Sequence, residues 1–185
     1  MKNEIRKAMK EMRNNMTKNE VLNKSALACK AFIQSDFYKN SNCIMIYKRL
    51  GNETDTEPII KQALADNKRL VFPVTDQKSG KITPYYADGS TKFDIGGFSV
   101  SEPKNSEIAN PLDINVVIIP GIAFDKLGAR VGFGKGCYDM FLPQTKAIKI
   151  GFCFDVQLAD KIPASHHDIN MDYIITESGI IDCQK

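Results

Sequence analysis

The absence of several features narrows the range of functions that this sequence can have. Its 185 residues include no tryptophan, only two histidines and no apolar run of about 18 residues, so no membrane-spanning helix is predicted. The cysteines are odd in number, and none is spaced as CxxC. With no secretory signal pattern either, we expect free thiols and a cytoplasmic protein. The cysteines are Cys29, Cys43, Cys137, Cys153 and Cys183.

The charges and the histidines also exclude classes of function. Lys and Arg number 25 against 22 Asp and Glu, and a net charge of +3 is too small to indicate nucleic acid binding. His166 and His167 are adjacent, and adjacent residues rarely bind one metal ion, so we place them in a solvent-facing loop. The excess of positive charge is confined to the first 13 residues, at Lys2, Arg6, Lys7, Lys10 and Arg13.

Amphipathic helices are predicted at the start of the chain. Apolar residues recur at helical spacing from Ile5 through Met9 and Met12 to Met16, and the basic residues lie beside that stripe. We expect Lys10 and Arg13 to face solvent. Thr17 and Glu20 form a capping box that starts a second helix. The buried face of this helix is expected to carry Leu22, Ala26, Cys29 and Ile33.

Short continuous apolar runs predict a sheet. The expected strands are 43–47, 70–74, 116–120, 148–152 and 173–175, with a helix at 57–66. Apolar strands separated by helices indicate an α/β fold, a three-layer sandwich with a mostly parallel open sheet and helices on both faces. The length suits one domain, residues 1–185. Residues 77–110 are expected to supply a hairpin or edge strand near 82–86 and loops that close over a site.

A basic, glycine-rich segment follows the third predicted strand. Gly132, Gly134 and Gly136 alternate with other residues, and Arg130 and Lys135 add positive charge. Glycines let the backbone turn tightly and present N–H groups to an anion. The spacing matches neither a Walker loop nor a dinucleotide fingerprint, and a tight turn before a helix would explain the glycines alone. The basic residues favour a phosphate-binding loop over that plain turn.

This segment resembles a family signature. Residues 120–142 read PGIAFDKLGARVGFGKGCYDMFL, similar to the pattern PGxAFDxxGxRxGxGxGYYDRFL of the 5-formyltetrahydrofolate cyclo-ligases, or 5,10-methenyltetrahydrofolate synthetases. Related pieces of the family layout lie at 53–56, 96–103 and 167–172, so the resemblance covers nearly the whole chain. Two positions depart from the pattern: Cys137 replaces an aromatic residue and Met140 replaces an arginine.

The resemblance implies an ATP-dependent ligase. ATP would phosphorylate the formyl oxygen of 5-formyltetrahydrofolate, and the second folate nitrogen would then attack the activated carbon to give 5,10-methenyltetrahydrofolate, ADP and phosphate. Phosphoryl transfer depends on positioning and charge neutralisation, so Mg²⁺ is the expected cofactor. The expected partners are ATP and 5-formyltetrahydrofolate, with no nucleic acid, no membrane and a monomeric protein.

The resemblance also assigns an ATP site. Arg130 and Lys135 are the expected catalytic residues, because they would neutralise the transferring phosphoryl group. Asp139 and Asp172 are the expected Mg²⁺ ligands, although Asp139 is equally explained as an acid in the first turn of a helix. The ATP-binding residues expected are Lys2, Arg6, Arg130, Gly132, Phe133, Gly134, Lys135, Gly136, Cys137 and Tyr138.

The folate site is expected after the first predicted strand. Glu53 and Asp55 would accept hydrogen bonds from the amino-pyrimidine edge of the pterin, and Leu50 and Tyr138 would contact the substrate as well. Asp55 or Thr56 has an alternative role as the cap of the helix at 57–66. Because ligands bind α/β sheets beyond the carboxyl ends of the strands, we expect these acids and the glycine-rich segment to face one cleft.

Other functions stay open. The same fold would suit another nucleotide-dependent ligase or kinase, with a different substrate at Glu53 and Asp55. A small basic RNA-binding domain is a further alternative, although no RNP-like aromatic run, KH-type loop or tryptophan supports it. A nucleophilic Cys137 is disfavoured, because no histidine is near in sequence and the reaction needs no covalent enzyme intermediate.

Overall fold

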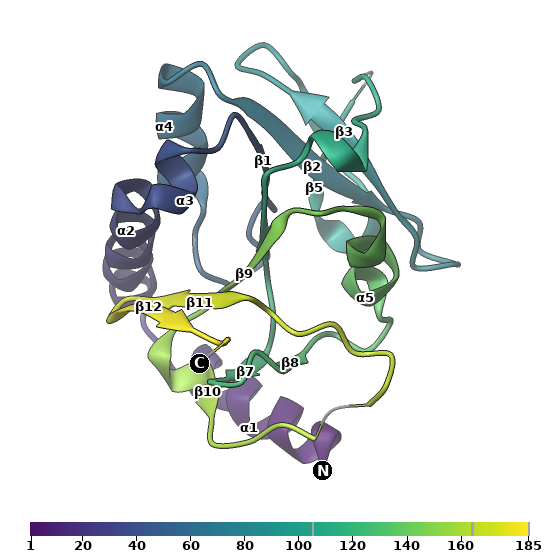
Figure 1. Cartoon of the computed structure of the whole chain (residues 1–185). Helices are drawn as coiled ribbons and strands as arrows, with labels where there is room; N and C mark the ends of the chain where they lie inside the picture. The colour runs from purple at the N-terminus through teal and green to yellow at the C-terminus, as the bar shows by residue number, and fades with distance from the viewer. Residues whose placement is uncertain (105, 164, 185) are drawn as a thin grey trace.

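A seven-stranded sheet crosses the molecule in the order β12-β11-β9-β6-β1-β2-β3 (Figure 1). The computed structural model describes residues 1–104, 106–163 and 165–184. The edge strands β3 (Ile82–Ala87) and β12 (Gly179–Asp182) are antiparallel to their neighbours, and the inner strands are parallel. All the predicted strands are present. The inner ones are β1 (Cys43–Met45), β2 (Arg69–Thr75), β6 (Val116–Ile119), β9 (Ile148–Phe152) and β11 (Tyr173–Thr176).

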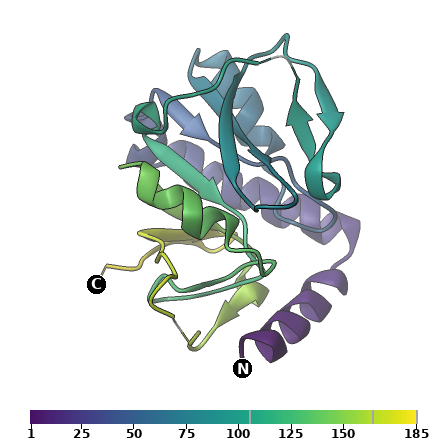
Figure 2. The same cartoon turned by 90° about the vertical axis from the view of Figure 1, so that its right-hand side faces the viewer.

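Helices lie on both faces of this sheet, as the three-layer prediction requires. Figure 1 shows α2 (Lys18–Gln34), α3 (Asp36–Lys39) and α4 (Glu57–Ala65) on one face and α5 (Cys137–Phe141) on the other. The first helix, α1 (Lys2–Asn14), lies at one end of the molecule in both views (Figures 1 and 2). None of the helices described is long and apolar enough to cross a membrane.

Smaller elements complete the fold. A three-stranded sheet of β10 (Leu158–Ala159), β7 (Ala123–Asp125) and β8 (Arg130–Val131) packs beside α1. A hairpin joins β4 (Phe93–Ile95) to β5 (Ser101–Pro103). Short 3-10 turns are η1 (Gly97–Ser99), η2 (Pro111–Asp113), η3 (Leu142–Gln144) and η4 (Asp155–Gln157).

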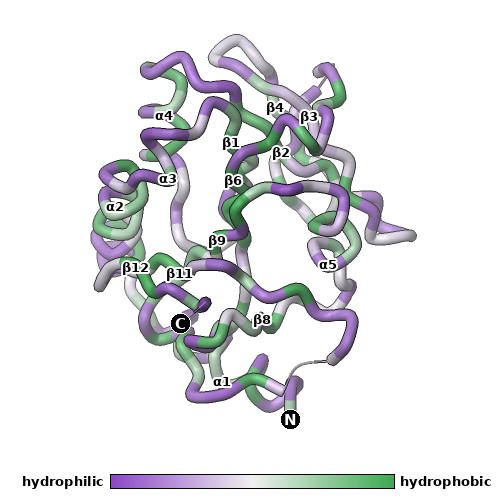
Figure 3. Tube along the Cα trace, viewed as in Figure 1, coloured by the Kyte–Doolittle hydropathy of each residue, from purple (hydrophilic) through white to green (hydrophobic). Residues whose placement is uncertain are grey.

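The continuous apolar strands follow from burial on both faces. Alternate residues of β1 point to opposite layers: Ile44 packs in the cluster under α2 and α4, and Met45 packs in the cluster that includes Phe141 of α5. A strand covered on both sides has no position for a polar side chain, so its sequence does not alternate. Figure 3 shows hydrophobic residues along the central strands and hydrophilic residues in most outer loops.

The start of α2 is predicted correctly, and its buried face only in part, since Cys29 is buried as expected. Glu20 N–H donates to Thr17 Oγ1 at 3.2 Å and Thr17 N–H donates to Glu20 Oε2 at 2.8 Å, which is the expected capping box. Leu22, expected inside, is 50% exposed. The real buried set is rotated by one residue, because apolar residues occupy both phases and packing on the sheet decides between them. It consists of Val21, Ser25, Ala28, Cys29 and Phe32.

The buried side of α1 also differs from the prediction. Ile5 and Met9 pack against the small sheet as expected, whereas Met12 is exposed. Arg13, expected in solvent, is buried with only 7% of its surface exposed. The last basic residue of the helix therefore faces the protein interior, and the expectation that Arg13 faces solvent is wrong.

Candidate active site

A cavity of about 710 Å³ lies at the carboxyl ends of β1, β2 and β6. The chain leaves β1 toward β2 on one side, while β6 and β9 lie on the other, so this is the point where strand order reverses. Ligands of α/β sheets bind at such points. The lining includes Tyr47, Lys48, Leu50 and Glu53 after β1, Pro73 and Thr75 of β2, Pro120 after β6, Lys2 and Arg6 of α1, Phe98, Ser99, Val100 and Glu102, Arg130 to Asp139, and Asp168.

The glycine-rich segment forms one wall of this cavity, between β8 and α5. Gly134 and Gly136 have φ angles of +111° and +64°, in a region that other residues rarely adopt. A Cβ on Gly132 would lie 2.7 Å from Nη1 of Arg130, so a larger residue there would have to displace this guanidinium. The segment is a tight turn, and its exposed backbone also borders the cavity. A tight turn and a phosphate-binding loop, the two interpretations considered from the sequence, are therefore compatible descriptions of this segment.

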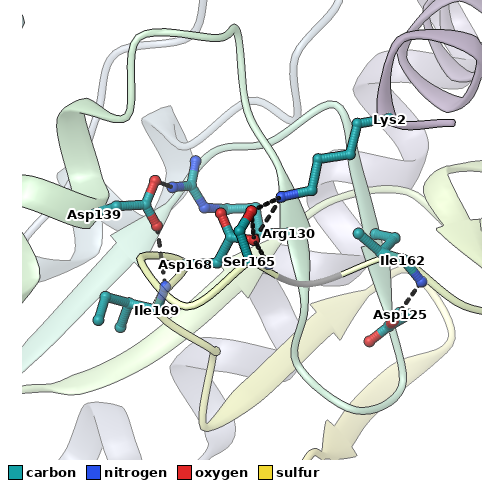
Figure 4. A network of polar contacts seen from close by, with 8 residues as sticks. All are labelled: Lys2, Asp125, Arg130, Asp139, Ile162, Ser165, Asp168 and Ile169. Carbon is teal, nitrogen blue, oxygen red and sulfur yellow. Dashed lines mark hydrogen bonds and ion pairs between the residues drawn. The ribbon is translucent and has the colours of Figure 1, made fainter.

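The basic residues at the start of α1 reach the same cavity. Arg6 Nε donates to the carbonyl oxygen of Gly132 at 3.0 Å, which ties α1 to the glycine-rich segment. Lys2 Nζ lies 2.5 Å from Oδ2 of Asp168 and 3.1 Å from Oγ of Ser165 (Figure 4). Partial burial alone would raise the pKa of Asp168, but the bonds from Lys2 and Ser165 hold it below its usual range.

Arg130 and Asp139 form a second ion pair in the cavity. Arg130 Nη2 donates to Asp139 Oδ2 at 2.9 Å, and the N–H of Ile169 donates to the other carboxylate oxygen at 3.1 Å (Figure 4). Only 7% of the Arg130 side chain is exposed. Both oxygens of Asp139 thus accept bonds from outside α5, so Asp139 is more than an acid in the first turn of a helix.

Asp172 does not lie in the cavity with Asp139. Its Oδ2 accepts the N–H of Lys149 at 2.8 Å and lies 2.8 Å from Lys149 Nζ, between β9 and β11. The acid that the structure brings to the cavity is Asp168, which the sequence analysis did not select. Both acids occur in the segment from His167 to Asp172, and only the path of the chain before β11 distinguishes them.

Lys135 is exposed at the rim of the cavity. Its ammonium group donates to the carbonyl oxygen of Gln77 and lies 4.8 Å from the centroid of the Phe98 ring. Phe98 belongs to η1 and has a φ angle of 55°, an uncommon conformation for a residue other than glycine. The loops of residues 77–110 therefore border the site, as expected. Phe133 is half exposed, and Lys10 Nζ lies 5.7 Å from its ring centroid.

The two acids expected to bind folate have different surroundings. Glu53 is 6% exposed, lines the cavity and accepts the N–H of Leu50 at 2.8 Å. Burial raises the pKa of Glu53, opposed by the Leu50 hydrogen bond and by the charge of Arg13. Asp55 lies outside the cavity lining, and its Oδ1 accepts the N–H of Glu57 at 3.2 Å. Asp55 therefore accepts the first N–H of α4 from the position before the N-cap residue Thr56, which is close to the alternative capping role considered for it.

Cys137 and Tyr138 both line the cavity at the start of α5. Burial raises the pKa of the Cys137 thiol, although the charges of Lys135 and Arg130 oppose this effect. A raised pKa is the opposite of what a nucleophilic cysteine requires. The Tyr138 ring centroid lies 5.6 Å from Cζ of Arg130, and burial raises the pKa of its hydroxyl, so it stays a neutral aromatic surface.

Comparison with known proteins places this chain in a family. The model described as the 5-formyltetrahydrofolate cyclo-ligase family matches residues 1–177. The chain belongs to this family. The 5-formyltetrahydrofolate cyclo-ligase of Saccharomyces cerevisiae is 31% identical over 77% of the chain and 79% of its own length. The cyclo-ligase of Mus musculus is 25% identical over 95% and 93%.

Two solved structures of 5,10-methenyltetrahydrofolate synthetases have the same fold as this chain. The NMR structure of the 5,10-methenyltetrahydrofolate synthetase of Aquifex aeolicus has a TM-score of 0.88 and 29% identity, covering all of this chain and 93% of that one. A synthetase from Mycoplasma pneumoniae, at 23% identity and a TM-score of 0.76, shares the fold. This chain is thus a cyclo-ligase whose signature segment, with Cys137 and Met140 as its departures, forms a cavity wall.

Proposed function

We propose that this cyclo-ligase converts 5-formyltetrahydrofolate to 5,10-methenyltetrahydrofolate in the cavity beyond β1, β2 and β6, with ATP phosphorylating the formyl oxygen. One observation carries the proposal. A basic loop rich in glycine and a buried carboxylate, Glu53, line the same 710 Å³ cavity. A phosphate donor and a ligand with hydrogen-bond donors can therefore meet there.

ATP would bind at the end of the cavity formed by α1 and the glycine-rich segment. Backbone N–H groups from Gly132 to Gly136 would face the phosphates, with Lys2, Arg6 and Lys135 supplying positive charge. Each charge-assisted contact contributes about 1.5–3 kcal/mol, so a few suffice for binding. Arg130 is deeply buried and bonded to Asp139, which suits it to fix the loop beside the transferring group.

Asp139 and Asp168 are the carboxylates that would hold Mg²⁺. Both border the cavity and are partly exposed, and their oxygens are the ligand type that Mg²⁺ prefers. When bound, Mg²⁺ neutralises charge on the phosphates. Asp172, which directly precedes β11, pairs with Lys149 of β9 and is not proposed as a ligand.

The pterin would bind at the other end of the cavity. Glu53 would accept hydrogen bonds from its amino-pyrimidine edge, while Leu50 and Tyr138 would contact its flat surface. This orientation would direct the formyl group toward the glycine-rich segment. Orientation of the two reactants is the main contribution that a protein makes to phosphoryl transfer.

We also propose that the enzyme acts as a monomer in the cytoplasm. One chain supplies both the glycine-rich segment and Glu53 to the cavity, which is compatible with a monomer. All five cysteines are free, as expected in a reducing compartment.

An absorbance assay tests the proposed function. The purified protein is mixed with MgATP and 5-formyltetrahydrofolate, and the near-ultraviolet chromophore of methenyltetrahydrofolate is followed. We expect a rise that needs both substrates and is lost in Glu53→Gln. ATP hydrolysis without that rise would instead indicate a ligase or kinase with another substrate.

A further inference from the structure

The turn between β2 and β3 packs against the glycine-rich segment and the start of α5 (Figure 1). Gly80 in this turn is buried and has a φ angle of +73°. A Cβ added to Gly80 would lie 3.2 Å from Cε of Met140 and 3.4 Å from Sγ of Cys137. The carbonyl oxygen of Lys135 would lie 3.5 Å from the same Cβ. The absence of a side chain at this position therefore allows the turn and the segment to pack directly on each other.

Cys137 and Met140 are also the two positions where the signature departs from the family pattern. Their side chains are smaller than the aromatic residue and the arginine of that pattern, and methionine adapts its shape to a neighbouring surface. Both side chains meet the same glycine of the turn. Cys137 also packs against the cluster that contains Ile82, the first residue of β3. The two departures therefore form one surface that accommodates this turn.

The same turn holds the side chain of Lys135. Its ammonium group donates to the carbonyl oxygen of Gln77, and the ring centroid of Phe98 lies 4.8 Å from the same nitrogen. Lys2 and Arg130 are paired with acids, whereas a carbonyl group orients an ammonium without neutralising its charge. An ammonium has three donors, so Lys135 can bond to Gln77 and still donate to a phosphate.

Hydrogen bonds within the turn fix its shape. The carboxylate of Asp76 accepts the N–H of Ser79 at 2.7 Å and its hydroxyl at 2.6 Å. Gly80 N–H donates to the carbonyl of Asp76 at 2.8 Å, and Asp76 N–H donates to the carbonyl of Lys81 at 2.9 Å. The bonds from Ser79 lower the pKa of Asp76, and the charge of Lys135 adds to this effect. The turn is closed by its own bonds, so the carbonyl that it presents to Lys135 has a fixed place.

We propose that Gln77 and Gly80 of the β2–β3 turn are positioning residues, which hold the ammonium group of Lys135 toward the ATP phosphates. Cys137 and Met140 are the surface that fixes the turn in this place. This inference rests on the proposed function, in which Lys135 contacts ATP. Residues 76–81 lie outside the cavity lining, so they act through Lys135 and not by touching a substrate. The effect of the turn is therefore on ATP and not on folate.

A double-mutant cycle tests this role. Gly80→Ala pushes the turn away from the segment, because the added Cβ lacks space and the φ angle suits glycine. Calorimetry gives the affinity for MgATP, and the absorbance assay gives the KM for each substrate. We expect Gly80→Ala to weaken MgATP binding about tenfold and to leave the KM for 5-formyltetrahydrofolate unchanged. In the Lys135→Ala background the same substitution should weaken MgATP binding by less than about twofold, because the group that the turn positions is gone.

Gly179→Ala is the matched control. Gly179 also lies where two antiparallel strands join and has a positive φ angle, +130°, but a Cβ added there meets no atom within 4 Å. It should change neither the MgATP affinity nor the KM values. An equal loss of MgATP affinity with and without Lys135 would overturn the proposal, because the turn would then not act through that residue. Unchanged affinity in folded Gly80→Ala would overturn it as well.

A second substitution covers a failure to fold. If Gly80→Ala does not fold, Gly80→Asn enters the cycle in its place, because asparagine tolerates a positive φ angle. If neither variant folds, the turn is required by the whole fold and the proposal is wrong. Should the unmodified protein bind MgATP but give no absorbance rise, the proposed folate substrate fails separately, and calorimetry on the cycle still decides the role of the turn. No binding of MgATP would overturn both.

Discussion

The ammonium group of Lys2 lies 2.5 Å from the carboxylate of Asp168, and this ion pair joins the first helix to the loop before β11. Arg130 and Asp139 form a similar pair at 2.9 Å. Each of these cations is thus balanced by an acid of the same cavity. Bound ATP would compete with Asp168 for Lys2, and a bound cation would compete with Lys2 for Asp168. The two pairs keep opposite charges close together without burying either one uncompensated.

The first prediction concerns acid stability. The pKa of Asp168 is lower in the folded chain than its ordinary value of about 3.9. A lowered pKa means that the Lys2 pair stabilises the fold above that ordinary value and is lost as the pH falls through the folded pKa. We expect Asp168→Asn to flatten the fall in melting temperature below about pH 4. Equal acid sensitivity in the variant and the unmodified chain would show that the pair does not contribute.

The second prediction concerns Lys135. Replacing it with alanine removes one charge-assisted contact to phosphate, worth about 1.5–3 kcal/mol, and so about a 10- to 150-fold loss in kcat/KM. Its side chain is exposed, so folding should be unaffected. Lys126→Ala, an exposed lysine outside the cavity lining, is the matched control. The absorbance assay measures both, and an unmodified rate in Lys135→Ala would remove this residue from the catalytic set.

The features of this fold that could be predicted from the sequence are those determined by residues close together in the chain. The strands are correct because burial on both faces leaves only apolar residues, and the cap of α2 is correct because Thr17 and Glu20 bond to each other. The buried faces of α1 and α2 depend on what they pack against, which periodicity alone does not specify.

In the site, too, the features set by neighbouring residues could be predicted and those set by tertiary packing could not. The glycine-rich segment carries its geometry in its own residues, so its place in the cavity follows from the sequence. The choice between Asp168 and Asp172 does not, because they are four positions apart and different strands and helices supply their partners. The burial of Arg13 was not predicted either, since nothing near it in sequence distinguishes a buried arginine from an exposed one.

The third prediction concerns Gly132. A Cβ there would lie 2.7 Å from Arg130 Nη1, and this guanidinium cannot move easily because it is buried and bonded to Asp139. Overpacking of this kind costs about 1–3 kcal/mol. We expect Gly132→Ala to lower the melting temperature and raise the KM for ATP. Gly89→Ala, where an added Cβ meets no atom within 4 Å, should change neither.

The fourth prediction separates the backbone of Cys137 from its thiol. Burial raises the pKa of that thiol, so little thiolate is available at neutral pH, and the ATP contact that the family resemblance implies for Cys137 would use its backbone N–H group. We expect Cys137→Ala to keep kcat within about threefold, which is less than 1 kcal/mol of barrier. Circular dichroism establishes that the variant is folded, and initial rates in the absorbance assay give kcat. A fall in kcat of about a hundredfold in folded Cys137→Ala would instead indicate a covalent role for the sulfur, because the substitution leaves the backbone N–H in place.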